Sequence, residues 1–231
     1  TLPLGLAYLG SVLEKAGYNT KILDAIGDTK PVLIKRNVDD IYNVQGLDTK
    51  EIIERIDPKT LVFGISLMFT QEWLLHRDFI KEVKKALPNV IIVVGGEHPT
   101  AIPEYVLKDC PEIDYIVRGE GELSLLELVH HIFNKKDPSK INGVGSLDKN
   151  GKFIDNGLSK RIEYIDEIPR PAWHLLKVEN YFNDYFTSGL ARGRNMAILA
   201  TRGCPYQCTF CSSPSMWTTR YVMRTPKDLV D

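Results

Sequence analysis

The order of the apolar runs is the feature that most constrains the fold of this chain. Residues 90–94 read Val-Ile-Ile-Val-Val, a β-branched run typical of a strand that is buried on both faces of a parallel sheet. Shorter strand-like runs occur at residues 61–66 and 115–117, and helix-like stretches cover residues 70–86 and 122–133. Strands that alternate with helices in this way predict an α/β domain with a doubly wound, flavodoxin- or Rossmann-like parallel sheet.

The segments before residue 61 follow a less regular pattern. Apolar residues between positions 6 and 16 recur at helical spacing, and Gly17 is expected to end that helix. Residues 20–24 predict a short strand, whereas residues 27–48 are polar and irregular and are interpreted as an insertion. A further short helix is expected at residues 103–108.

Small or polar residues follow the carboxyl ends of the three predicted strands. They are Ser66, Gly95, Gly96, Gly119 and Glu120. Ligands of open α/β sheets bind along this edge, where glycine lets the backbone approach a ligand closely. The same glycines also fit a purely structural role, turning each strand into the next helix. No G-x-G-x-x-G motif stands between a strand and a helix, so a nicotinamide site is unsupported.

Three cysteines lie in one short loop. Cys204, Cys208 and Cys211 form a C-x3-C-x2-C pattern, with Phe210 just before the last cysteine. Thiolates this close can converge on one soft metal centre, and cysteine thiolates are the usual ligands of iron–sulfur clusters. No fourth cysteine lies nearby, so a four-iron cluster here would keep one iron open, as reactive metal sites do.

Other uses of these cysteines fit the sequence less well. A structural zinc site takes four ligands, but Cys110 is distant in sequence and no histidine lies between Cys204 and Asp231. A disulfide framework would need more cysteines and a secretory context, and ferredoxin-type clusters use four cysteines at other spacings. Zinc and a disulfide therefore remain the alternatives to an iron–sulfur cluster.

A connector is expected between the α/β domain and the cysteine loop. Residues 144–147 and 152–155 flank an Asn-Gly pair that suits a tight hairpin turn. Residues 168–173 contain two prolines and predict an extended passage. Four aromatic residues follow, which favour packing of the connector over a contact with a ligand: Tyr181, Phe182, Tyr185 and Phe186.

The segments around the cysteine loop predict a strand and a helix. Residues 196–201 form an apolar run that leads into the loop, which is expected to follow the carboxyl end of a strand. Thr225 and Pro226 predict a helix start, with Thr225 as the cap and proline at the first helical position.

Composition excludes several classes of protein. The chain has 231 residues, with 43% hydrophobic and 26% charged residues, as is ordinary for a globular protein. A net charge of −1 gives no electrostatic footprint for nucleic acid. No apolar run approaches the ~20 residues of a membrane span, and no signal peptide is visible. Unpaired cysteines fit a reducing compartment, so we expect a cytoplasmic protein.

The cysteine loop resembles the signature of the radical S-adenosylmethionine (SAM) enzymes, C-x3-C-x-aromatic-C. The resemblance implies that Cys204, Cys208 and Cys211 hold a [4Fe–4S] cluster whose open iron binds SAM. One electron from the cluster would cleave SAM to a 5′-deoxyadenosyl radical. The strand before the loop would then be the first strand of a β/α barrel, most of which would lie beyond Asp231.

The segments before the loop resemble the cobalamin-binding domain of B12-dependent radical SAM proteins. The matching stretches are residues 3–9, 64–66, 95–100 and 119–122, together with the connector at residues 166–173. The resemblance implies that cobalamin contacts Ser66, Gly95, Gly96, Gly119 and Glu120. It divides the chain into a cobalamin-binding domain (1–140), a linker (141–190) and the truncated start of a radical SAM domain (191–231).

The sequence departs from related corrinoid proteins in two ways. Corrinoid methyl carriers use D-x-H-x-x-G, whose histidine ligates cobalt, but with Gly5 as the final glycine the histidine position is Leu2. The resemblance therefore implies no histidine lower ligand. His98 is an alternative ligand, although we interpret it as solvent-facing or capping. In a flavodoxin-like order the first strand lies inside the sheet, so we expect an upstream strand before Pro3.

The resemblance implies a B12-dependent radical SAM enzyme in which methylcobalamin transfers a methyl group to an unactivated carbon. The alternatives are ring formation or rearrangement, as in anaerobic porphyrin cyclases, and a non-catalytic corrinoid- or iron–sulfur-binding protein. The implied partners are a small-molecule or peptide substrate and a one-electron donor such as a flavodoxin or ferredoxin. We expect the residues that select the substrate to lie beyond Asp231, so these 231 residues are not expected to complete the reaction.

Overall fold

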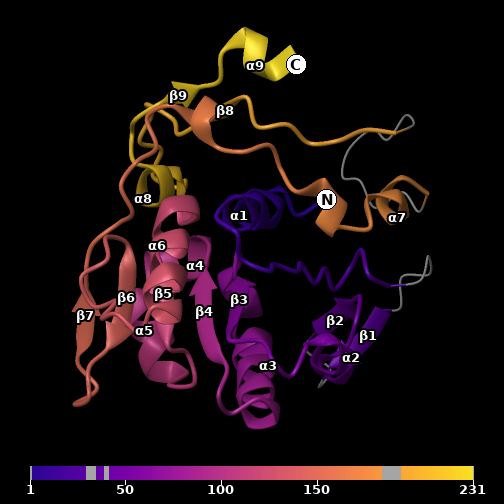
Figure 1. Ribbon diagram of the computed structural model, residues 1–231, viewed down its shortest axis with the longest axis vertical. Helices are drawn as coiled ribbons and strands as arrows, with labels where there is room; N and C mark the ends of the chain where they lie inside the picture. Colours follow the sequence, from indigo (N-terminus) through magenta and orange to yellow (C-terminus); the bar gives the residue numbers. More distant parts are fainter. Residues whose placement is uncertain (1, 30–34, 39–41, 184–193, 231) are drawn as a thin grey trace. The chain divides into compact units, whose positions relative to one another are not determined.

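The computed structural model describes residues 2–29, 35–38, 42–183 and 194–230 (Figure 1). The chain forms two compact units. The first unit comprises Thr1–Asp57 and Pro169–Ile198, and the second comprises Pro58–Ile168 and Leu199–Asp231. Each unit therefore combines segments that are far apart in the sequence.

A five-stranded sheet forms the centre of the second unit. Its strands, in spatial order, are β3 (Val62–Ser66), β4 (Ile91–Gly95), β5 (Tyr115–Val117), β6 (Val144–Leu147) and β7 (Phe153–Asp155). The first three strands are parallel and confirm the strands predicted from the sequence. The last two are antiparallel and come from the predicted hairpin, which we had placed in the linker. The sheet is therefore mixed.

Helices cover both faces of this sheet. Val62 of β3 packs into the core beneath α6 (Gly121–Phe133). The next residue, Phe63, meets Phe79 of α3 (Trp73–Ala86), with ring centroids 6.3 Å apart. Successive side chains of a strand point to opposite faces, so α3 and α6 lie on opposite faces. The doubly wound α/β arrangement predicted from the sequence is confirmed.

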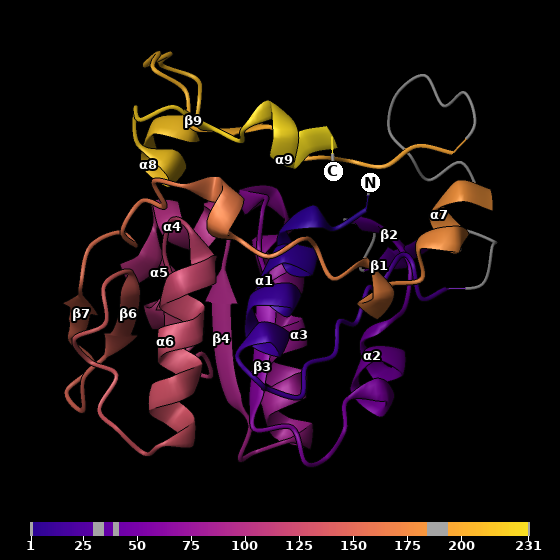
Figure 2. The same cartoon turned by 45° about the horizontal axis from the view of Figure 1, so that its top comes forward.

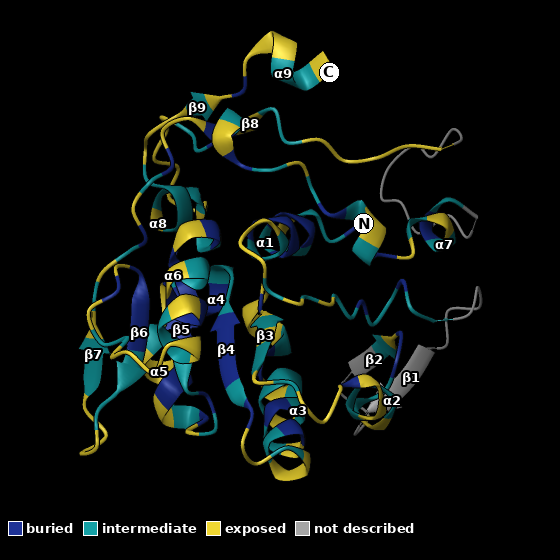
Figure 3. Ribbon diagram, in the orientation of Figure 1, coloured by how far each residue is buried: buried dark blue, intermediate teal, exposed yellow. Residues whose placement is uncertain are grey.

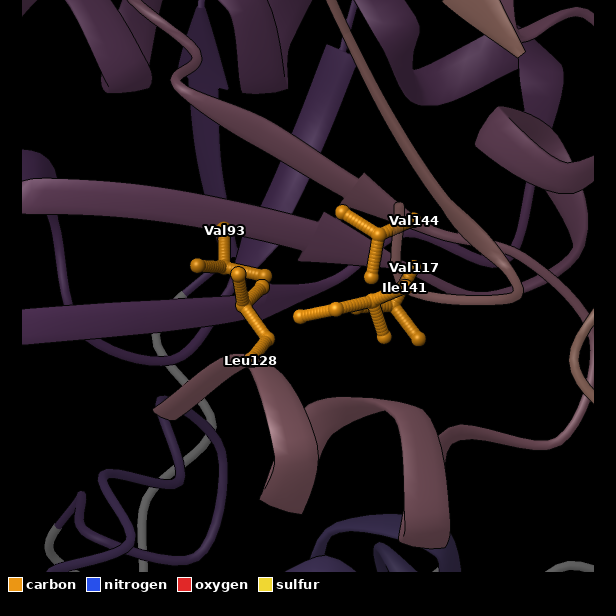
Figure 4. Close-up of a cluster of buried hydrophobic side chains, with 5 residues drawn as sticks. All are labelled: Val93, Val117, Leu128, Ile141 and Val144. Carbon is orange, nitrogen blue, oxygen red and sulfur yellow. The ribbon is translucent and has the colours of Figure 1, made fainter. Parts of the chain in front are cut away.

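Five buried aliphatic side chains form the core between α6 and the sheet: Val93, Val117, Leu128, Ile141 and Val144 (Figure 4). They come from β4, β5, α6, β6 and the turn before β6. The three central residues of β4 are all buried (Figure 3). The unbroken β-branched run of β4 follows from this position, because neither face of the strand meets water.

Short helices connect the strands of the second unit. A 3-10 turn, η1 (Thr70–Glu72), leads into α3, while α4 (Glu97–Ala101) and α5 (Pro103–Asp109) join β4 to β5. The sequence predicted α5 but not α4. A helix as short as α4 displays too few residues for an apolar period to be visible.

The end of the second unit contains a small two-stranded sheet. Strand β8 (Thr201–Arg202) pairs antiparallel with β9 (Val222–Met223). The strand predicted over residues 196–201 is much shorter in the structure, because β8 finds only this brief antiparallel partner among the described residues. In the sequence, helix α8 (Ser213–Trp217) lies between β8 and β9, and another 3-10 turn, η2 (Ile165–Glu167), comes before β8.

The last helix, α9 (Pro226–Val230), begins as the sequence predicted. The backbone N–H of Asp228 donates to Thr225 Oγ1 at 3.2 Å. This bond satisfies one of the free N–H groups in the first turn of the helix.

The first unit contains helices and one hairpin. Its elements are α1 (Leu4–Lys15), β1 (Lys35–Val38), β2 (Tyr42–Gln45), α2 (Thr49–Arg55), η3 (Trp173–Leu175) and α7 (Val178–Asn183). The helix predicted near the start of the chain is confirmed, and Gly17 follows it with φ +89°. The segment that we interpreted as an irregular insertion contains the antiparallel pair β1 and β2.

The short strand predicted at residues 20–24 is wrong. Asp24 turns the chain there, with its Oδ1 accepting from the N–H of Ile26 at 3.2 Å and its Oδ2 accepting from the hydroxyl of Tyr181 at 2.5 Å. Tyr181 is buried, so this aromatic residue packs within its unit as predicted. Tyr185 and Phe186 lie outside the described residues. Within the described ranges, no helix is both long and apolar enough to cross a membrane.

Candidate functional site

The three parallel strands end level with one another at one edge of the sheet. Ser66 of β3 is the register partner of Gly95 of β4, and Gly95 in turn is the partner of Val117 of β5. Gly96 directly follows β4, and Gly119 follows β5 by two residues. Four of the five predicted cofactor contacts therefore gather along this strand-end edge.

Two of these glycines occupy backbone conformations that other residues rarely adopt. Gly96 has φ +107°, and a Cβ at this position would lie 2.5 Å from the carbonyl oxygen of Leu67. Gly119 has φ +79°, and its N–H donates to Thr100 Oγ1 at 3.1 Å. Both glycines turn a strand into a helix, as the structural interpretation of the sequence allowed. Gly96 is half-buried, whereas Gly119 is buried.

Glu120, the fifth predicted contact, directly follows Gly119, so its main chain lies at the same edge. Its side chain is buried, with Oε2 accepting from the N–H of Ile162 at 2.5 Å and Oε1 paired with Arg161. Burial raises the pKa of Glu120, whereas the N–H of Ile162 and the guanidinium of Arg161 act in the opposite direction. The carboxylate is thus engaged within the protein.

A second buried ion pair links α6 to β8. Glu122 pairs with Arg202, and their side chains are 7% and 4% exposed. Arg202 also lies 3.7 Å from Glu120. The guanidinium carbons of Arg161 and Arg202 lie 5.6 and 5.3 Å from the ring centroid of Trp217. We call Glu120, Glu122, Arg161 and Arg202 the Glu–Arg network.

Three members of this network, Glu122, Arg161 and Arg202, were not predicted from the sequence as site residues, and neither was Trp217. Glu122 was noted only as part of a motif, and its partner Arg202 stands far away in the chain. The spacing of a sequence motif cannot relate two residues that are so far apart in the chain. The available signal was the pair of acidic residues at the end of a buried strand, because buried carboxylates need cationic partners.

The predicted cysteines lie in the loop between β8 and α8. Cys204 is half-buried, Cys208 and Cys211 are exposed, and all three are free thiols. The N–H of Cys211 donates to the carbonyl of Cys208 at 3.1 Å, so the loop turns between them. Gly203, with φ +81°, begins the loop against the carbonyl oxygen of Arg220, where a Cβ would overlap that atom.

The donor set of this loop fits a metal held by three thiolates. The three sulfurs are not gathered into a preformed site, since no group of three or more His, Cys, Asp or Glu in the described ranges could hold a metal ion. Cys110 is buried, and burial raises its pKa to about 12. A thiol in that state is a poor ligand, so Cys110 adds no fourth donor.

Both ends of the cysteine loop contact the strand-end edge. Before the loop, Arg202 pairs with Glu122. After the loop, α8 packs on α4 (Figure 2), and the carbonyl oxygen of Met216 lies 3.5 Å from the position of a Cβ on Gly119. All of these residues belong to the second unit. The strand ends and the cysteine loop therefore form one candidate site.

His98 is buried rather than solvent-facing, which corrects the sequence interpretation. Its Nδ1 lies 3.0 Å from Thr70 Oγ1, and its ring packs on Trp73 with centroids 5.1 Å apart. Burial is the main reason that its pKa is lowered. Its Nε2 finds no hydrogen-bond partner among the described residues. Leu2, at the expected cobalt-ligand position, is a buried residue of the first unit.

Comparison with known families gives one match. Residues 1–129 match the model of a family described as "B12 binding domain". This region covers the parallel strands β3, β4 and β5, together with the whole strand-end edge.

Several curated proteins are similar to this chain over nearly its whole length. An uncharacterized methyltransferase of Pyrococcus horikoshii is 32% identical, over 95% of this chain and 42% of that protein. Cytidylyl-2-hydroxyethylphosphonate methyltransferase of Streptomyces wedmorensis is 30% identical, over 100% and 47%. Anaerobic magnesium-protoporphyrin IX monomethyl ester cyclase of Synechocystis is also 30% identical, over 97% and 40%. The chain spans less than half the length of these relatives.

A solved structure shows the same fold. It is the radical S-adenosylmethionine methyltransferase TsrM from Kitasatospora setae, with cobalamin and a [4Fe-4S] cluster bound. The TM-score is 0.71 at 20% identity, over 99% of this chain and 42% of that chain.

Proposed function

Because the chain belongs to the B12-binding domain family, we propose that it forms the cobalamin-binding part and the cluster loop of a B12-dependent radical SAM methyltransferase. One observation carries the proposal: a loop with three free thiols is anchored on the strand-end edge within one compact unit. Groups suited to two cofactors therefore lie together. The similarity to two methyltransferases supports methyl transfer as the reaction.

The predicted site residues form two groups, one for each cofactor. We assign the [4Fe–4S] cluster to Cys204, Cys208 and Cys211, whose free thiols supply three soft ligands. We assign cobalamin to the edge formed by Ser66, Gly95, Gly96, Gly119 and Glu120. Glu120 would take part through its main chain, because its carboxylate is already engaged. The domain bounds that accompany this proposal are 1–140, 141–190 and 191–231.

The residues of this chain would bind the two cofactors and hold the cysteine loop in position. When bound, the cluster would supply the electron that cleaves SAM to a 5′-deoxyadenosyl radical, and methylcobalamin would supply the methyl group. Gly95 and Gly96, which are half-buried, would let a flat ligand approach the main chain. The ion pair of Glu122 with Arg202 fixes the start of the cysteine loop. Exposure of Cys208 and Cys211 leaves their thiols open to iron.

The proposed partners follow from this chemistry. A one-electron donor such as a flavodoxin or ferredoxin would reduce the cluster, and a small molecule or peptide would accept the methyl group. The net charge of −1 gives no field that would attract nucleic acid. Free thiols and an oxygen-sensitive cluster suit a reducing cytoplasm.

A second candidate function is radical ring formation. The similarity to the anaerobic magnesium-protoporphyrin IX monomethyl ester cyclase of Synechocystis favours it, with 30% identity over 97% of this chain. Both reactions would use the same two cofactors. In the full-length enzyme, 5′-deoxyadenosine formed together with a methylated product supports methyl transfer, whereas 5′-deoxyadenosine without methyl transfer supports ring formation. Absence of 5′-deoxyadenosine indicates a non-catalytic binding protein.

The cluster assignment is tested by anaerobic reconstitution of the chain with iron and sulfide. We expect about four iron atoms per chain, the content of one [4Fe–4S] cluster. Each of the variants Cys204→Ala, Cys208→Ala and Cys211→Ala should lose most of this iron. Cys110→Ala is the matched control and should keep it, because Cys110 is buried away from the loop. Stoichiometric zinc without iron would overturn the assignment.

A further inference from the structure

We propose that the Glu–Arg network couples the two cofactor sites, so that occupation of one site changes the affinity of the other. The inference rests on the proposed function, which supplies the two cofactors. Within it, Glu120, Glu122, Arg161 and Arg202 act as positioning residues. None of the four side chains needs to touch a cofactor.

The network is a connected set of charges removed from water. The side chains of Glu120, Glu122 and Arg202 are at most 7% exposed, and that of Arg161 is 10% exposed. Arg161 pairs with Glu120, and Arg202 lies between Glu120 and Glu122. Charges in such an environment interact far more strongly than on the surface. A shift of Glu120 therefore acts on both arginines, and a shift of Glu122 acts on Arg202.

The carboxylates of the network belong to the strand-end edge. Glu120 and Glu122 flank Gly121, where β5 passes into α6. The preceding residue, Gly119, is held by the hydrogen bond from its N–H to Thr100. Because Gly119 is buried, a ligand that reaches it must displace or stiffen this segment. Either change acts directly on the two carboxylates that follow.

Arg202 stands at the start of the cysteine loop, and Arg161 lies against it. Arg202 immediately precedes Gly203 and Cys204. Nη2 of Arg161 donates to the carbonyl oxygen of Arg220 at 3.2 Å. The same carbonyl leaves no room for a side chain at Gly203. Both arginines therefore help to position the backbone that leads to Cys204.

Trp217 extends the network to the far end of the loop. Its ring lies beneath both arginines, at 5.6 Å from Arg161 and 5.3 Å from Arg202. Such contacts strengthen when the cation is desolvated. Because Trp217 ends α8, which follows the cysteine loop, the network contacts both ends of that loop.

Coupling of this kind is measurable and reciprocal. If cluster assembly changes the affinity for cobalamin by some factor, cobalamin changes the affinity for the cluster by the same factor. The quantity to measure is the ratio of two dissociation constants of hydroxocobalamin, one for the chain with its cluster and one for the chain without it. Anaerobic equilibrium dialysis gives both, with iron determined in the same samples.

For the unmodified chain we expect these two constants to differ by about tenfold, within the range usual for coupled sites. Glu122→Gln removes one charge at nearly constant shape and should bring the ratio close to one. Since a lone substitution removes the closer carboxylate of the buried Arg202, the double variant Glu122→Gln with Arg202→Gln is measured as well. Removal of both charges is better tolerated than removal of one.

The matched control is Asp114→Asn. Asp114 pairs with Lys84 at 2.9 Å in the same unit, but it precedes β5 and so lies at the opposite edge of the sheet. This variant should keep the tenfold ratio. A purely structural role of the network would lower stability without abolishing the ratio, so the ratio separates the two roles.

Two results would overturn the coupling while leaving the proposed function intact. One is a ratio of one in the unmodified chain, with both cofactors bound. The other is a tenfold ratio that persists in the double variant. Failure of every form to bind cobalamin would instead overturn the corrinoid assignment, and the coupling with it.

Discussion

At the scale of single residues, burial divides the four cysteines into two chemical classes. Cys110 is fully buried, with its pKa raised to about 12. Cys208 and Cys211 are exposed, and Cys204 is half-buried. Because the thiolate is both the nucleophile and the metal ligand, only the three loop cysteines have the access that iron loading requires.

This division predicts the pattern of alkylation. In the metal-free chain, iodoacetamide should modify Cys204, Cys208 and Cys211 and leave Cys110 intact until urea unfolds the protein. Mass spectrometry of the digested chain reads each site separately. Native-state labelling of Cys110 as fast as that of Cys208 would contradict the burial of Cys110.

The backbone conformation of Gly96 predicts that a side chain at this position lowers the stability of the protein. In Gly96→Ala, the new Cβ would meet the carbonyl of Leu67 in an extended positive-φ conformation that costs an L-residue about 1–3 kcal/mol. The control is Gly151→Ala, since Gly151 has φ +76° with no atom within 4 Å of a Cβ. Urea unfolding should show a larger loss for Gly96→Ala than for Gly151→Ala. Equal losses would mean that the contact with Leu67 relaxes without cost.

The burial of His98 predicts that the stability of the protein depends on pH. Its pKa is lowered by burial in the folded state, whereas an unfolded histidine titrates at ~6.5. As the pH falls below that value, the unfolded chain takes up a proton that the folded chain does not, so stability decreases. The fall in unfolding free energy between pH 7 and pH 5 should be smaller in His98→Gln than in the unmodified chain. An identical fall would exclude this contribution.

At the scale of the elements, α6 is held to the sheet by its buried face. Leu128 is fully buried among valines of β4 and β5, so Leu128→Ala should cost about 3 kcal/mol of stability. Leu123 lies on the same helix but is 53% exposed. Leu123→Ala, the matched control, should change stability by less than ~0.5 kcal/mol. Similar urea midpoints for the two variants would contradict the packing of α6.

The elements also show why some of the fold was predictable. The β-branched run of β4 and the long amphipathic stretch of α3 carry their structure in local periodicity. The predicted strand at residues 20–24 is absent because the segment finds no partner strand among the described residues, while Asp24 bonds to Tyr181, which is distant in sequence. The pairing of Glu122 with Arg202 is equally non-local. The thiol loop could be found from spacing alone, but the network that anchors it could not.

At the scale of the whole molecule, the chain combines distant segments into each compact unit. The strand ends of the parallel sheet and the cysteine loop share the second unit, although the linker separates them in sequence. Because the cysteine loop is anchored on the strand-end edge at both of its ends, the two predicted sites form one site. We propose that this unit serves cobalamin and an iron–sulfur cluster together.

The most direct test is the metal content of a single preparation. The chain is reconstituted anaerobically with iron, sulfide and hydroxocobalamin, freed of unbound material, and analysed for iron, cobalt and zinc. We expect about four iron atoms and about one cobalt atom per chain, corresponding to one [4Fe–4S] cluster and one corrinoid. Iron without cobalt, or zinc in place of iron, would contradict this proposal.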